Sequence, residues 1–182
     1  MHLGLSPELA DEDSCKAISL VRSSQVHSAA AGAQVEVKPA PGKGLGVFAV
    51  ERLPAGRFLG CYGGAVLTDE EVANSTSAYI FSLGGGLNMD AGDGCAGANW
   101  TRFMNHAQRR ANVTARVCRG SSTLHAVFDD DGGWADIEVP AGPRVEFWTC
   151  QCIKAGEELS FHYGTDYAEH LQQELRSLGL DL

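Results

Sequence analysis

Apolar and polar residues alternate over short stretches of this chain, and glycine or proline separates one stretch from the next. A period of two residues is typical of half-buried strands. The pattern predicts strands at residues 35–38, 45–50, 57–62, 79–83, 113–118, 123–128, 134–139 and 144–152. With these strands and 22 glycines in 182 residues, we expect one domain that is mainly β, of the α+β class, with many turns.

The two ends of the chain follow different patterns. Residues 1–33 predict a leader that is partly helical or loose, with a helix start at Ser6 and Pro7. The ordered domain is expected over residues 34–167. Apolar residues then recur at helical spacing between 166 and 178, which predicts an amphipathic C-terminal helix within a final segment, residues 168–182.

Two loops have informative sequences. The segment RLPAG at 52–56 is echoed by CIKAG at 152–156, and both follow one predicted strand and precede another, so we expect the same turn twice. The segment DDDGG at 129–133 joins two predicted strands as a hairpin turn. It lacks the spaced acidic residues and the distal glutamate of a calcium loop.

The charge balance restricts the class of partner. Lys and Arg total 14 against 23 Asp and Glu, a net charge of −9. A protein that binds nucleic acid would carry a basic stripe, so we expect that this chain does not bind nucleic acid directly. The acidic balance suits a basic protein or peptide partner, although solubility alone is an equally good explanation.

The six cysteines and the apolar runs indicate a setting inside the cell. The cysteines form no C-x-x-C pair, and no histidine spacing completes a zinc site, so we expect free thiols and no bound metal. Cys150 and Cys152 are expected on one side of a strand. No apolar run reaches the ~18 residues of a membrane span. We therefore expect a soluble, intracellular protein.

Three segments carry residue types that suggest a ligand site. The first, GKGLGVFA at 42–49, opens a predicted strand, and its glycines allow a tight turn or a close approach of backbone to ligand. It is neither a P-loop nor a dinucleotide fingerprint. The second is RFMNH at 102–106, and the third is EELSFHYG at 157–164. An Asn-His pair together with a Tyr at a strand end suggests group transfer.

These segments resemble the signature motifs of SET-domain protein-lysine methyltransferases. RFMNH matches R-F-x-N-H, ELSFHYG matches E-L-x-F-D-Y-G, and RFLGCYGG at 57–64 resembles a segment written E-Y-x-G. The resemblance covers about residues 34–167. Cys61 replaces the Glu of the family, His162 replaces its Asp, and the Cys and Pro that often follow Asn-His are missing. The zinc-binding cysteine clusters that flank many relatives are also absent, so the resemblance is to the small, cysteine-poor type.

The resemblance implies a β-clip fold of several small sheets with a knot-like C-terminal core. It implies that Tyr163 is catalytic and that Tyr62 and Phe161 line a channel for the substrate lysine. A Phe at 161 leaves room for a second or third methyl group. The terminal helix would help to close the site. The cofactor S-adenosylmethionine would be held by Lys43, Gly44, Leu45, Gly46, Arg102, Phe103, Asn105, His106, Tyr163 and Tyr167.

The implied function is transfer of methyl groups from S-adenosylmethionine to a lysine amine of a protein, with a histone tail as the first candidate substrate. Two alternatives stay open: methylation of a non-histone protein, and a catalytically silent SET domain that only binds a partner. The resemblance implies a nuclear location, with the cytoplasm as the alternative. Residues 65–99 and the hairpin at 119–143 are expected to choose the substrate. The oligomeric state is left open.

Overall fold

Several small sheets build the body of the protein in the computed structural model, which describes residues 35–95, 97–128 and 134–164. The first sheet has the order β1-β2-β12-β7, formed by β1 (Val35–Ala40), β2 (Gly44–Ala49), β12 (Glu158–Phe161) and β7 (Asn105–His106). Strands β1 and β2 form an antiparallel hairpin, and β12 pairs antiparallel with β2. The last strand of the described chain is therefore in the middle of this sheet, next to one of the first.

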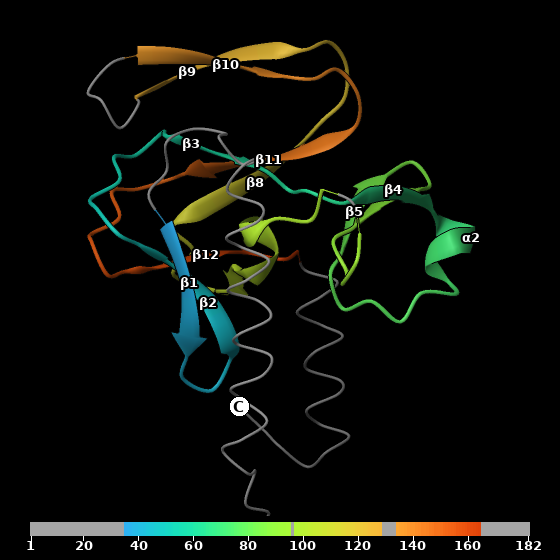
Figure 1. The fold of residues 1–182 in the computed structure, drawn as a ribbon, viewed down its shortest axis with the longest axis horizontal. Coiled ribbons are helices and arrows are strands. Elements are labelled where there is room, and N and C mark those ends of the chain that lie inside the picture. The colour runs from blue at the N-terminus through green and yellow to red at the C-terminus, as the bar shows by residue number, and fades with distance from the viewer. Residues whose placement is uncertain (1–34, 96, 129–133, 165–182) are drawn as a thin grey trace, which may run out of the picture.

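A second sheet has the order β3-β11-β8, with β3 (Phe58–Cys61), β11 (Arg144–Thr149) and β8 (Val113–Cys118) all antiparallel. A separate hairpin, β9 (Thr123–Phe128) and β10 (Trp134–Val139), lies above this sheet in Figure 1. Strand β11 is buried at most positions because it is covered on both faces. The main core covers one face, and a small cluster that includes Phe58, Ile137 and Val139 covers the other; we call this region the hairpin base.

The third sheet belongs to an insertion that projects to one side of the body (Figure 1). Its order is β4-β6-β5, with β4 (Ala65–Thr68), β6 (Leu87–Asp90) and β5 (Ile80–Gly84). A one-turn helix, α2 (Asp69–Val72), follows β4, and Thr68 and Glu71 form a capping box at its start. The 3-10 helix η1 (Trp100–Phe103) leads from the insertion into β7.

The main core fills the space between the first two sheets and the insertion. Strands β2, β3, β11 and β12 each contribute fully buried side chains to it, among them Val47, Leu59, Phe147 and Leu159. Each of these strands contributes apolar residues to this core because the sheets face one another across it. The hydrophobic pattern thus predicts the mainly β body correctly.

The two similar loops do form the same turn, and they also pair with each other. Leu53 and Ile153 are both fully buried and exchange two backbone hydrogen bonds of 2.9 Å across an isolated antiparallel bridge. Each turn ends at a glycine with positive φ, 77° at Gly56 and 80° at Gly156. A residue with a Cβ would be strained at either glycine, which explains why both loops end in Ala-Gly.

The strand predictions are confirmed for β8, β9 and β10, whose bounds match, and are shifted by one or two residues for β1, β2, β3 and β5. The expectation of a strand continuing to residue 152 is wrong. Strand β11 ends at Thr149, whose hydroxyl donates a 2.6 Å hydrogen bond to the Pro54 carbonyl, and the chain then turns away. Cys150 and Cys152 are consequently exposed beyond the sheet.

Several expectations lie outside the described residues: the leader over residues 1–33, the turn at 129–133, Tyr167 and the C-terminal helix. The antiparallel register of Trp134 with Phe128 is that of the expected hairpin. In the described part of the chain, no helix is long and apolar enough to cross a membrane.

Candidate functional site

The site begins where the two most specific segments of the sequence meet. Strands β7 and β12 pair in parallel, with Asn105 opposite Ser160 and Phe161 opposite His106. The Ala107 amide extends this pairing with a 3.1 Å hydrogen bond to the Phe161 carbonyl. Two segments more than fifty residues apart in the sequence therefore lie side by side. We call this pair of strands the motif crossing.

Asn112 fixes strand β12 of the motif crossing through hydrogen bonds from its backbone and its side chain. Its backbone amide donates to the Ser160 carbonyl, and its side-chain oxygen accepts a 2.9 Å hydrogen bond from the Ser160 amide. Its side-chain nitrogen donates to the Glu158 carbonyl at 2.8 Å. Asn112 is buried, and the strand hydrogen bonds satisfy its amide, which keeps a buried polar side chain compatible with the core.

Asn105 joins the glycine-rich segment to the motif crossing. Its side-chain nitrogen donates a 2.9 Å hydrogen bond to the Leu45 carbonyl and a 2.8 Å hydrogen bond to Glu158 Oε1. Lys43 donates to the other carboxylate oxygen of Glu158 at 2.8 Å. The network of Lys43, Glu158 and Asn105 thus connects all three segments that the sequence singled out.

The glycines of the first segment act in different ways. Gly44 has a φ of +78° and open space where a side chain would lie, so it serves the turn and leaves that side of the loop uncovered. Gly46 lies against the Glu158–Asn105 pair, where an added Cβ would lie 3.0 Å from Glu158 Oε1 and 3.1 Å from Asn105 Nδ2. A side chain at 46 would therefore push the network apart.

Tyr163 is held at two points by the segment around β7. Its hydroxyl donates a 2.5 Å hydrogen bond to the Met104 carbonyl, and its backbone amide donates a 3.2 Å hydrogen bond to His106 Nδ1. Its ring is half-buried, with its centre 4.6 Å from that of Phe161. The phenol of Tyr163 therefore has a defined position beside the Asn-His segment.

An aromatic cluster surrounds this tyrosine. The ring of Phe161 stacks on Phe81 with centres 6.1 Å apart and meets the ring of Phe147 at 4.9 Å. Tyr62 contacts Phe81 and donates its hydroxyl proton to the Tyr79 carbonyl at 2.9 Å. Burial, followed by repulsion from a charged Tyr163, raises the pKa of Tyr62 well above its usual range, so Tyr62 stays neutral.

Arg102 and Phe103 lie behind this cluster and hold the insertion to the body. The guanidinium of Arg102 donates to the Ala91 carbonyl at 2.6 Å, forms an ion pair with Asp93, and lies 4.3 Å from the ring centre of Tyr79. Arg102 Nε is buried without a hydrogen-bond partner among the described residues. In this structure the side chain of Arg102 is thus engaged mainly in fixing the insertion.

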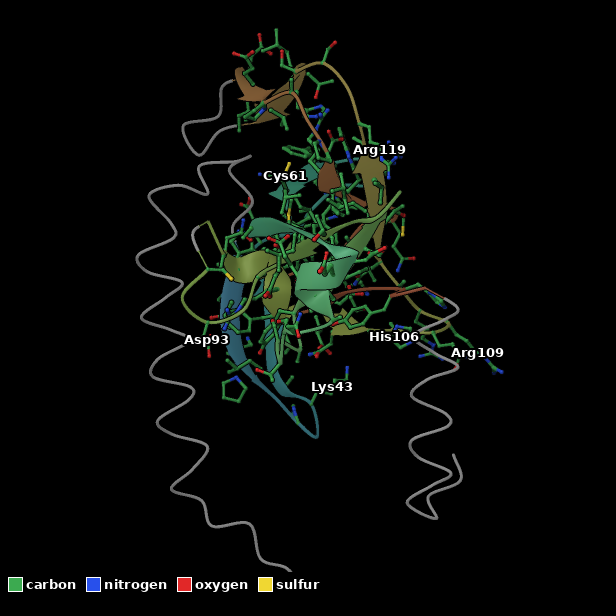
Figure 2. The ribbon with its side chains drawn as sticks, turned by 90° about the vertical axis from the view of Figure 1, so that its right-hand side faces the viewer. Lys43, Cys61, Asp93, His106, Arg109 and Arg119 are labelled. Atoms are coloured by element: carbon green, nitrogen blue, oxygen red, sulfur yellow. The ribbon has the colours of Figure 1, made fainter. Side chains whose placement is uncertain are left out.

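The two departures from the family motifs have different surroundings. Cys61 lies opposite Glu146 on β11, and burial followed by the Glu146 charge raises the pKa of its thiol to about 11. It is therefore a neutral thiol, and Figure 2 shows it well away from Lys43 and His106. His162 is exposed, and its ring centre lies 5.1 Å from that of His106.

The structure brings most of the predicted site residues together. Lys43, Leu45, Asn105, His106 and Tyr163 meet at the motif crossing, whereas Tyr167 lies outside the described residues. Tyr62 and Phe161 share one aromatic cluster with Phe81 and Phe147. No group of three or more potential metal ligands occurs among the residues that the structure describes.

Sequence reasoning missed three contributors to the site. Glu158 is part of the third segment, and its place in that motif is a signal that could have identified it. Phe81 and the carbonyl of Tyr79 come from the insertion, which carries no recognised motif. Only the folded chain places these two residues against Tyr62.

Comparisons with known proteins agree with this geometry. The family model for the SET domain matches residues 44–164. Among curated proteins, the chain is 28% identical over 129 residues to the histone-lysine N-methyltransferase SUV39H2 of Gallus gallus, covering 67% of this chain and 28% of that protein. It is 30% identical over 136 residues to the histone-lysine N-methyltransferase Su(var)3-9 of Drosophila melanogaster, covering 69% of this chain and 19% of that protein. The chain thus spans less than a third of the length of these relatives.

A solved structure gives the same result for the fold. The structure of ctPRC2 in an autoinhibited conformation bound to S-adenosylmethionine matches with a TM-score of 0.50 and 26% sequence identity. The match covers 80% of this chain and 17% of that chain.

Proposed function

This chain belongs to the SET-domain family, and we propose that it transfers methyl groups from S-adenosylmethionine to a lysine amine of a protein, with a histone tail as the first candidate. The observation that carries the proposal is the parallel pairing of β7 with β12, which puts Tyr163 against the Asn-His segment. The relatives reported above are histone-lysine N-methyltransferases, which supports the substrate class. A nuclear location follows from a histone substrate, with the cytoplasm as the alternative.

The residues at the motif crossing fit the cofactor. The uncovered side of the loop at Gly44 leaves room for a ligand, and the buried, unpartnered Nε of Arg102 is a spare donor behind the site. We propose that Lys43, Gly44, Leu45, Gly46, Asn105, His106 and Tyr163 hold it, with Arg102 and Phe103 behind them and Tyr167 closing the site. When bound, S-adenosylmethionine supplies a methyl group on a positively charged sulfur.

We propose that the aromatic cluster lines the apolar channel in which the substrate lysine loses its proton. A free lysine has a pKa of about 10.4, so about one side chain in a thousand carries the neutral, reactive amine at pH 7.4. A channel walled by Tyr62 and Phe161 would desolvate the ammonium group and lower its pKa, because burial disfavours the charged form. Both side chains are buried in this structure, as is Phe147, whose ring contacts both of theirs.

Tyr163 would orient the amine through its phenol oxygen. Two hydrogen bonds and the Phe161 contact already fix this tyrosine, so little freedom has to be lost when substrate arrives. Correct alignment of reacting groups can lower a barrier by roughly 7–11 kcal/mol. The net charge of −9 would favour encounter with a basic peptide.

The experiment is transfer of a labelled methyl group from S-adenosylmethionine to a panel of histones. The variants are Tyr163→Phe, which removes only the phenol oxygen, and Val117→Thr, a control at an exposed position of β8. We expect transfer by the wild type and Val117→Thr, and loss of at least a hundredfold in Tyr163→Phe. Cofactor binding without transfer to any histone would indicate a non-histone substrate. Neither binding nor transfer would overturn the proposal in favour of a binding module.

A further inference from the structure

Two imidazole rings flank the backbone of Tyr163. His106 Nδ1 accepts a 3.2 Å hydrogen bond from the Tyr163 amide, and the His106 and Tyr163 ring centres are 5.3 Å apart. One residue further along the chain, the Gly164 amide donates a 3.0 Å hydrogen bond to His162 Nδ1. The two imidazoles meet edge to face at 5.1 Å.

The hydrogen bond to Tyr163 requires one protonation state of His106. A backbone amide is a donor, so the Nδ1 of His106 must carry a lone pair, and the ring proton must be on Nε2. A protonated imidazole has a hydrogen on both nitrogens and cannot accept this bond. Protonation of His106 would therefore break the hydrogen bond that holds the Tyr163 amide.

Among the described residues, the charges near His106 disfavour its protonation. His162 faces the ring directly, and the exposed Arg109 and Arg110 follow His106 in the same loop; Figure 2 shows Arg109 on the same side of the body. The Glu158 carboxylate on β12 is engaged with Lys43 and Asn105, and the Tyr163 hydroxyl with Met104. Burial, followed by repulsion from His162, lowers the pKa of the His106 imidazole.

We propose that His106 is a positioning residue that holds Tyr163 through its neutral Nδ1, and that His162 keeps His106 in this accepting form. A carboxylate at 162, as in the family motif, would have the opposite effect, because it would attract a proton to His106. The inference rests on the proposed function only where it predicts an effect of His106 and His162 on the rate of methyl transfer. The coupling between His106, His162 and the Tyr163 amide is a property of the folded chain.

The direct test follows the coupling by NMR between pH 5 and 8 in the full chain. The signals to follow are the imidazole of His106 and the backbone amide of Tyr163. We expect the Tyr163 amide to shift with the same midpoint as the His106 ring. His162→Asp should raise that midpoint by about one pH unit, whereas His162→Asn, of similar size and without charge, should move it much less. A Tyr163 amide that ignores the His106 titration would overturn the proposal, as would an unchanged midpoint in His162→Asp.

The second readout is the pH profile of methyl transfer. His106→Asn keeps an acceptor oxygen near the place of Nδ1 but does not titrate, so its profile should keep the fall in rate at low pH that the substrate lysine causes and lack the further fall that His106 causes in the wild type. When each protein's rate is normalised to its own rate at pH 8.5, a midpoint raised by one unit lowers the rate of His162→Asp at low pH by up to about tenfold relative to the wild type. The ratio to His106→Asn removes the contribution of the substrate lysine, which is common to all variants. Identical pH profiles for the wild type, His106→Asn, His162→Asp and His162→Asn would contradict the inference.

Failure of the proposed function gives a different result. If the NMR coupling is present and no variant transfers methyl groups to any substrate, the histidine pair holds Tyr163 as inferred and the methyltransferase proposal is at fault. Thermal unfolding of each variant at pH 8 identifies any that has lost its fold.

Discussion

The motif crossing and the base of the β9–β10 hairpin are both buried polar structures, but they are built differently. At the motif crossing, neutral amides of Asn105 and Asn112 bond to backbone, and one ion pair lies at the edge. The hairpin base instead depends on charge. Arg144, on β11, donates to Glu146, to Thr123 Oγ1 and to the Gly142 carbonyl.

Aromatic rings complete the hairpin base. The ring of His125 lies 4.4 Å from that of Phe58 and 4.9 Å from that of Trp148, and its Nε2 is 3.6 Å from Glu146. Burial works to raise the pKa of the Glu146 carboxyl, but the hydrogen bonds from Arg144 and Trp148 and the charges of His125 and Arg144 outweigh it, so its pKa is lowered. The comparison teaches that neutral amides hold the strand pairing at the motif crossing, whereas the attachment of the hairpin depends on a carboxylate and therefore on pH.

The largest difference between the regions should appear in apolar truncations. Leu159 is fully buried on β12, so Leu159→Ala should destabilise the protein by about 3–5 kcal/mol through lost burial and a cavity. Leu124 on β9 is 69% exposed, so Leu124→Ala should change stability by about 0.5 kcal/mol or less. Urea unfolding measures both variants. Similar losses would mean that the hairpin is as strongly packed as the motif crossing.

The second effect separates the regions by pH. Glu146→Gln removes the carboxylate that pairs with Arg144, and we expect a loss of about 1.5–3 kcal/mol at pH 7. A lowered folded-state pKa means that the carboxylate stabilises the protein above its unfolded-state pKa, and this contribution disappears as the pH falls through the folded-state value. The stabilities of wild type and variant should therefore converge as the pH falls below about 4.3, the usual pKa of a glutamate carboxyl. An equal difference at pH 7 and pH 3 would contradict this account.

The third effect tests the close packing at the motif crossing. Gly46→Ala places a Cβ 3.0 Å from Glu158 Oε1, and we expect a loss of about 1–3 kcal/mol from overpacking. Gly44→Ala is the matched control: it has open space, and its strain at φ +78° should cost about 1–2 kcal/mol. Combination with Asn105→Ala should be non-additive for Gly46 and additive for Gly44. Additive losses of stability in both double variants would show that Gly46 does not interact with the network of Lys43, Glu158 and Asn105.

The smallest effect concerns the ion pair at the edge of the motif crossing. The Lys43 side chain is 45% exposed, so its pairing with Glu158 should contribute about 1 kcal/mol or less. Glu158→Gln keeps an acceptor for Asn105 and should lose no more than this, whereas Glu158→Ala should lose more because Asn105 also loses its partner. A double-mutant cycle with Lys43→Ala measures the pair. Equal losses of stability in Glu158→Gln and Glu158→Ala would show that the hydrogen bond from Asn105 to Glu158 contributes little to stability.

The regular strands could be predicted from the sequence because their signal is local. Residues 113–118, 123–128 and 134–139 alternate clearly, and the structure has β8, β9 and β10 at these bounds. The repeated Ala-Gly turns were also visible, although not their mutual pairing. Strands β4 and β6 are short and lie in an insertion rich in glycine, so alternation had too few residues to reveal them.

The remaining features depend on contacts between distant segments. Strand β7 has two residues and exists because β12 lies beside it. The end of β11 at Thr149 follows from a hydrogen bond to Pro54, which the alternation through Cys152 cannot show. For the site, motif matching found Asn105, His106 and Tyr163, but the aromatic partners Phe81 and Phe147 come from strands without motifs.

The central claim is that the motif crossing forms a site for S-adenosylmethionine. The most direct measurement is calorimetric titration of this cofactor into the wild type, Asn105→Ala and Thr123→Val, the last at the hairpin base. We predict one cofactor per chain for the wild type, at least tenfold weaker binding for Asn105→Ala, and unchanged binding for Thr123→Val. No binding by the wild type, or equal binding by Asn105→Ala, would contradict the account.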